Sequence, residues 1–248
     1  MNYLAVKDLE KRWGLTVVSF LPHSVHGLVR SLQDRLLLLV YPNGEHIERR
    51  GEPAIELYSG TQLHCTHLTL ARSNGWGPVR EADLVKPGRD LFALYQAILE
   101  VASYTSPMEV ELTRLKVSAQ DNSILLLGQC TGESIGAREG LLSGLNSSLP
   151  DSFYLSRRNW DTDAARYKQV HCRLGFIKRP LLNAEEFSKA VDALDLAPLT
   201  CTLDHIVLVH HRYRSLLTPH DGIVNFRLGA STPKPLTRDE FARALCLQ

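Results

Sequence analysis

The sequence predicts an α+β protein made of two pseudo-symmetric α/β lobes, with mainly antiparallel sheets around a central cleft. Three observations predict this class. Short apolar runs indicate many strands, apolar residues at helical spacing indicate helices between them, and a histidine-bearing strand occurs twice in similar surroundings. The 248 residues suffice for one domain with a large core. We therefore expect residues 1–248 to form a single two-lobed domain, with residues 231–248 as a C-terminal extension.

Local composition predicts the elements of the first third of the chain. Residues 16–21 are rich in β-branched and aromatic residues, which favours a strand. Residues 24–34 carry apolar residues at helical spacing, and the apolar run at residues 36–41 has the length of a strand. We also expect a short helix within residues 1–14, a strand over residues 54–58, and a first motif strand over residues 63–72.

The remaining elements follow in the same way. Asp90 is placed to cap a helix over residues 91–99. In residues 108–117 the apolar alternation changes phase, which predicts a bulged strand. Asn183 and Glu186 have the spacing of a capping box at a helix start. We further expect strands near residues 123–130, 168–177, 200–210 and 223–228, a helix near residues 135–149, and one short helix in the tail.

Composition excludes several classes of function. The formal net charge of +1 is too small for the broad basic surface that duplex DNA requires, although a small phosphorylated ligand needs only local positive charge. The five cysteines are scattered without a CxxC pair, so we expect neither a disulfide framework nor a metal site but buried, reduced thiols in a cytoplasmic protein. We find no apolar run long enough for a signal peptide or a transmembrane helix.

The candidate functional residues lie on the two motif strands. The first reads Leu63-His64-Cys65-Thr66-His67-Leu68-Thr69, with two His-x-Thr triplets, and the second reads Val170-His171-Cys172-Arg173. Residues two apart on a strand point to the same face, so a His-x-Thr triplet aims an imidazole and a hydroxyl into one site. Two such strands facing each other would supply one histidine that takes a proton and one that gives it.

The first motif can be placed in two registers. His67 and Thr69 are followed by an apolar residue, whereas His64 and Thr66 match the second motif better. In that comparison both motifs read apolar-His-Cys and both have an arginine eight residues after the histidine, at Arg72 and Arg179. Since His64 and His67 face opposite sides of a regular strand, only one can enter the site. We favour His64 and Thr66, with His67 and Thr69 as the alternative.

Two His-x-Thr-type strands in two such lobes resemble the pattern of the 2H phosphoesterase superfamily, which includes 2'-5' RNA ligase-like proteins and cyclic nucleotide phosphodiesterases. The resemblance covers residues 16–228, and the second motif departs from it because Arg173 stands where Thr or Ser is expected. It implies a phosphodiesterase that needs no metal or other cofactor and acts on a 2',3'-cyclic phosphate, a 2'-5' linkage or a small cyclic nucleotide. Its partner would be a nucleotide or a short RNA end.

Within this resemblance, His64 and His171 are the candidate general base and acid, since histidine titrates near neutral pH. Thr66 and Arg173 are candidates for contacts with the phosphate. Arg72 and Arg179, with Tyr154 and Arg157 from the segment before the second motif, are candidate substrate-binding residues.

Two alternatives remain. Arg173 either holds the phosphate or fills the site, in which case the protein is a degenerate relative that binds a nucleotide or a protein without turnover. The other alternative is an unrelated α/β domain whose triplets are accidental. Of the other histidines, His205 is expected to serve packing, and His210 and His211 to lie at a solvated strand end or in a basic wall.

Overall fold

The computed structural model describes residues 12–40, 54–74, 90–118, 122–148, 168–178, 181, 184–211, 222–229 and 235–245. Its strands are β1 (Arg12–Phe20), β2 (Ile55–Leu57), β3 (His64–Asn74), β4 (Met108–Val117), β5 (Ser123–Cys130), β6 (Gln169–Ile177), β7 (Leu199–Leu203), β8 (His205–His211) and β9 (Ile223–Arg227). Its α-helices are α2 (His26–Val40), α4 (Leu91–Tyr104), α5 (Ser134–Ser148), α7 (Ala184–Asp192) and α8 (Arg238–Ala244), and two short 3₁₀ helices are η1 (His23–Val25) and η2 (Gly60–Gln62).

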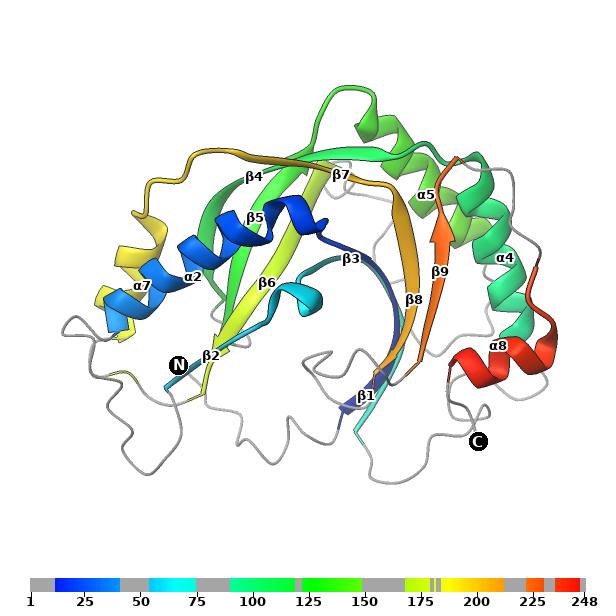
Figure 1. Cartoon of the computed structure of the whole chain (residues 1–248), viewed down its shortest axis with the longest axis horizontal. Coiled ribbons are helices and arrows are strands. Elements are labelled where there is room, and N and C mark those ends of the chain that lie inside the picture. Colours follow the sequence, from blue (N-terminus) through cyan, green and yellow to red (C-terminus); the bar gives the residue numbers. More distant parts are fainter. Residues whose placement is uncertain are drawn as a thin grey trace.

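The strands form one curled antiparallel sheet (Figure 1). Its order is β7-β4-β5-β6-β3-β1-β8-β9, and β2 pairs with β6 off this path. The α+β class predicted from the sequence is therefore confirmed. Within the described part of the chain, no helix is both long and apolar enough to span a membrane.

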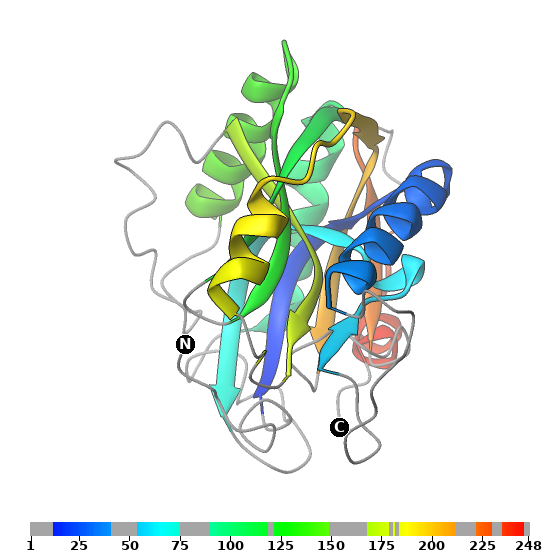
Figure 2. The same cartoon turned by 90° about the vertical axis from the view of Figure 1, so that its left-hand side faces the viewer.

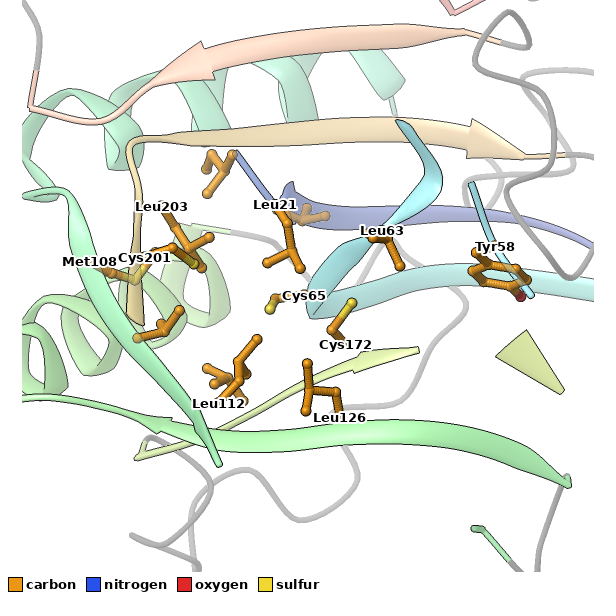
Figure 3. Packing of buried hydrophobic residues seen from close by; sticks show 14 of the residues in the cluster. Leu21, Tyr58, Leu63, Cys65, Met108, Leu112, Leu126, Cys172, Cys201 and Leu203 are labelled. Carbon is orange, nitrogen blue, oxygen red and sulfur yellow. The ribbon is translucent and has the colours of Figure 1, made fainter. Parts of the chain in front are cut away.

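A narrow seam divides the sheet into two groups of strands. β3 and β6 pair only through Cys65 and Cys172, whereas β1 pairs with β3, and β5 with β6, over most of their lengths. On one side of the seam lie β7, β4, β5 and β6, and on the other lie β3, β1, β8 and β9. Figure 3 shows the side chains of Cys65 and Cys172 next to each other among buried leucines. The two motif strands thus meet at the centre of the sheet.

All five helices pack on the same face of the sheet. The main hydrophobic core contains buried residues from each of them, for example Leu36 of α2, Val191 of α7 and Phe241 of α8. Figure 2 shows α2 and α7 beside each other on this face. The opposite face carries a smaller cluster made only of strand residues, namely Val18, Val207 and Val209 with Phe20 and Ile223. We call this second side the open face.

Three expectations about the elements need correction. The apolar run at residues 36–41 is no strand: up to Val40 it continues α2, because Leu36 follows Val29 and Leu32 on the buried side of that helix. The strand expected over residues 200–210 is broken at Asp204, so that β7 joins one group of strands and β8 the other. Residues 12–14, expected at the end of a helix, belong to β1, and residues 1–11 lie outside the described residues.

Other local expectations are confirmed. The Asp90 side chain accepts a hydrogen bond from the Phe92 backbone N–H and so caps α4. The register of β4 shifts between Leu112 and Arg114, where the apolar alternation changes phase. Of the five cysteines, Cys65, Cys130, Cys172 and Cys201 are buried and unpaired, and Cys246 lies outside the described residues. Asn183, the first residue of the expected capping box, lies outside the described residues.

Candidate active site

The pairing of β3 with β6 brings both motifs to the open face. Directly opposed residues of an antiparallel pair point to the same side of the sheet, and the opposed Cys65 and Cys172 are both buried in the main core. The neighbours of these cysteines therefore point to the open face. These neighbours are His64 and Thr66 on β3 and His171 and Arg173 on β6.

The two histidines are diagonal neighbours across the seam. Continuing the register from the cysteine pair places His64 opposite Arg173 and Thr66 opposite His171. Diagonal neighbours in a regular antiparallel pair lie about 7–8 Å apart, and their Cβ atoms are somewhat closer. His64 is 8% exposed, His171 is exposed, and Thr66 and Arg173 are half-buried. One sheltered and one accessible imidazole thus flank a space into which a hydroxyl and a guanidinium also point.

The ring of His64 is oriented by the turn that precedes its strand. His64 Nδ1 lies 2.7 Å from the backbone carbonyl oxygen of Gln62, the last residue of η2. Because a carbonyl only accepts, Nδ1 carries the hydrogen, and Nε2 is the acceptor atom of the neutral ring. The η2 turn is itself held by a capping box between Ser59 and Gln62. The Phe20 ring meets the His64 ring edge-on, with centroids 6.1 Å apart.

His67 takes the opposite side of β3. Val17 of β1 pairs with Leu68 and Val18 with Thr66, so His67 is the extra residue of a bulge. Its Nε2 lies 2.8 Å from the Ser19 hydroxyl, whose own hydrogen is donated to the His205 carbonyl oxygen. His67 Nε2 must therefore be the donor. The His67 ring is 5% exposed and lies on the core side, away from the face that carries His171.

Burial keeps His67 neutral. Loss of hydration, together with the smaller influence of the charges of Arg138, His171 and His64, lowers its pKa to about 3. Unfolding exposes the ring and returns its pKa to the ordinary value near 6.5. Between these two values the unfolded state binds more protons than the folded state, so acidification in this range favours unfolding.

We therefore expect His67 to add a pH-dependent term to stability. As the pH falls from about 6.5, the free energy of unfolding should decrease by up to about 1.4 kcal/mol per pH unit from this residue. Urea titrations at pH 7.0, 6.0 and 5.0 should show a shallower decrease for His67→Gln than for the wild type. An equal pH dependence in both proteins would contradict the neutral, buried state of this histidine.

The other predicted site residues are only partly placed. Arg72 belongs to β3 by its backbone, and its side chain lies outside what the structure describes. The candidates Tyr154, Arg157 and Arg179 lie wholly outside the described residues.

Two expectations about the remaining histidines are wrong. His205, expected to serve packing, is exposed, and its Nδ1 lies 2.8 Å from Asp204 Oδ1. His210 lies neither at a solvated strand end nor in a basic wall, because it is buried on the core side, with Nδ1 2.9 Å from the Leu245 carbonyl oxygen. The side chain of His211 lies outside the described residues. Among the described residues, no three His, Cys, Asp or Glu side chains are grouped to hold a metal ion.

Sequence reasoning missed the residues that orient the histidines. Gln62 acts through its backbone carbonyl, which leaves no pattern of residue types. Ser19 contacts His67 only because β1 and β3 pair in a bulged register. The one available signal was the Ser59–Gln62 spacing, which is that of a capping box just before the first motif.

Comparison with known proteins identifies the fold. No family model matches the sequence, and no curated protein matches it significantly. Among solved structures, E. coli LigT complexed with NADP+ aligns with a TM-score of 0.50 and 14% identity, over 88% of this chain and 99% of that chain. TT0787 of Thermus thermophilus aligns with a TM-score of 0.48 and 20% identity, over 87% of this chain and 98% of that chain. The chain thus has the fold of LigT-like 2H phosphoesterases, as its sequence motifs indicated.

Proposed function

We propose that this chain is a metal-independent phosphodiesterase that acts on a nucleotide or an RNA end, with His64 and His171 as general base and general acid. The observation that carries the proposal is the convergence of His64, whose ring is oriented by Gln62, with His171, Thr66 and Arg173 on the open face of a 2H phosphoesterase-type sheet. The likeness to a LigT structure complexed with NADP+ supports a nucleotide as the ligand class.

The proposed reaction on a 2',3'-cyclic phosphate assigns one proton transfer to each histidine. Nε2 of neutral His64 takes a proton from the attacking water while the oxygen of that water forms a bond to phosphorus. The bond from phosphorus to one ribose oxygen breaks, and His171 as imidazolium gives its proton to that oxygen. The product is a phosphomonoester on the other ribose oxygen. After turnover the two histidines exchange protons with solvent and regain their starting states.

Thr66 and Arg173 would hold the non-bridging phosphate oxygens. The Thr66 hydroxyl donates one hydrogen bond, and the Arg173 guanidinium supplies charge-assisted contacts that strengthen as negative charge develops. Arg173, which stands where the family motif has Thr or Ser, therefore changes how the phosphate is held. The proton transfers remain with the histidines. The same arginine also favours a second candidate function, a protein that binds a nucleotide tightly without turning it over.

A small substrate panel in the presence of EDTA tests the proposal. It contains adenosine 2',3'-cyclic phosphate, a 2'-5'-linked diadenosine and adenosine 3',5'-cyclic phosphate. We expect the wild-type protein to hydrolyse at least one of them in EDTA, with a phosphomonoester as product by chromatography. Calorimetry with adenosine 2'-phosphate runs in parallel. Binding without turnover of any substrate would favour the second candidate, and absence of both would overturn both candidates.

A further inference from the structure

The open face continues from the histidine motif onto two neighbouring strands. β6 pairs with β5, and β5 pairs with β4, in an unbroken register over the two rows that contain His171 and Arg173. Opposed residues in such pairs share a face. The two rows, read from β6 to β4, are His171–Leu127–Arg114 and Arg173–Leu125–Lys116.

These rows have a distinct chemical pattern. Arg114 and Lys116 are exposed on β4, and Leu125 and Leu127 are half-buried on β5. A strip of apolar surface therefore separates two cationic positions, one at the histidine motif and one on β4. For a chain with a formal net charge of +1, three cationic residues beside a histidine in two adjacent rows are a marked local concentration.

Within the described ranges, no carboxylate forms an ion pair with Arg114 or Lys116. The two acids on the same side of β4, Glu109 and Glu111, both lie beyond the bulge, with Glu111 opposite Gln129 and Glu109 opposite Thr202. The other end of the sheet differs. There Arg227 lies opposite His205, and the hydrogen bond from His205, together with the weaker influence of the Arg227 charge, lowers the pKa of Asp204. The cationic side chains of Arg114 and Lys116 are thus placed to attract an anion.

The distance between strands separates the cationic position on β4, formed by Arg114 and Lys116, from a phosphate bound at the histidines. Neighbouring strands lie about 4.8 Å apart, so β4 is roughly 10 Å from β6. A phosphate held between His64 on β3 and His171 on β6 lies beyond β6 from β4. A nucleoside with a phosphate at each end has charge, apolar body and charge in the same order as the surface. The long side chains of Arg114 and Lys116 can reach toward the β5 strip.

We propose that Arg114 and Lys116 bind the 5'-phosphate of the nucleotide whose 2',3' end lies at His64 and His171, with its nucleoside across Leu125 and Leu127. This inference rests on the proposed function and narrows its substrate class. The preferred substrates are 5'-phosphorylated nucleotides and RNA 3' ends, in which that phosphate joins the terminal nucleotide to the rest of the strand.

Two substrates that differ in one group test the proposal. They are adenosine 2',3'-cyclic phosphate with a free 5'-hydroxyl and the same compound with a 5'-phosphate. We expect wild-type kcat/KM to be about tenfold or more higher for the 5'-phosphorylated compound, because two charge-assisted contacts are gained. Arg114→Gln combined with Lys116→Gln should lose most of this preference, whereas the control Arg227→Gln should keep it. Equal preference in the double variant and the wild type would overturn the proposal.

A binding experiment keeps this outcome separate from that of the proposed catalysis. The His171→Ala protein is titrated with adenosine 2'-phosphate and with adenosine 2',5'-bisphosphate at several salt concentrations. We expect the bisphosphate to bind at least about tenfold more tightly than the monophosphate, with a steeper salt dependence. Adding Arg114→Gln and Lys116→Gln to the His171→Ala protein should remove both differences. If the wild-type protein turns over no substrate but the bisphosphate still binds more tightly, the catalytic proposal fails and the 5'-phosphate site stands. If both ligands bind equally, the 5'-phosphate site is overturned.

Discussion

Replacing His171 with alanine should lower kcat for the preferred substrate by about 10²- to 10⁴-fold, the usual contribution of a positioned general acid or base. The fold should survive, because His171 is exposed and its removal opens no cavity in the core. His64→Ala should have an effect of similar size. Since the two histidines act in one step, the double variant should lose much less than the product of the two single losses.

Steady-state kinetics in EDTA measures these losses, and His205→Ala is the matched control. His205 is also an exposed histidine on the open face, but it lies on β8, beyond β1 and β3 from the seam. Its replacement should change kcat less than about threefold, in line with a residue that supplies neither proton. Full activity in His171→Ala would refute the two-histidine mechanism. A comparable loss in His205→Ala would show that the proton donor has been misassigned.

The largest effect on stability is expected at Phe226. This residue is 1% exposed on β9, where its ring lies 5.7 Å from the ring of Tyr95, and Tyr95 packs in turn against Phe241 of α8. Truncation to alanine removes the contacts that join β9 to α4 and α8 and leaves a cavity. We therefore expect Phe226→Ala to lower the free energy of unfolding by about 3–5 kcal/mol.

Urea unfolding followed by circular dichroism measures this change, with Phe226→Leu as a conservative comparison. Leucine fills most of the space, so this variant should lose less than half as much. Because Phe226 points to the core side and away from the histidine motif, kcat should stay near the wild-type value below the melting temperature. A loss below about 1 kcal/mol in Phe226→Ala would mean that the three elements do not depend on this ring.

How far the sequence predicts the structure depends on the range of the interactions involved. Strands such as β4 and β5 follow from local alternation, and the Asp90 cap follows from a side chain and the nearby backbone. The apolar run at residues 36–41 was misread because a short apolar run satisfies a strand and a buried helix alike; the burial of Leu36 alongside Val29 and Leu32 decides between them.

The site shows the same division. The motif spacing identified His64, His171, Thr66 and Arg173, and pairing in space brings these residues to one face. The bulge at His67 and the roles of Gln62 and Ser19 depend on which strands become neighbours, and residue types along the chain do not encode that choice. Arg114 and Lys116 could not be predicted as site residues from the sequence for the same reason. Only the register across two strand pairs connects them with the motif.

The continuous segment from β7 through Asp204 to β8 has a consequence for how the chain folds. β7 adds the edge strand of one group by pairing with β4, and β8 extends the other group by pairing with β1, near the opposite end of the chain. During synthesis both groups therefore keep an open strand edge until this one segment emerges. Pairing over such sequence separations makes folding slow and leaves those edges exposed to aggregation. A single stretch of backbone thus closes the edge of β4 and covers the edge of β1 late in synthesis, and only β9 is added after it.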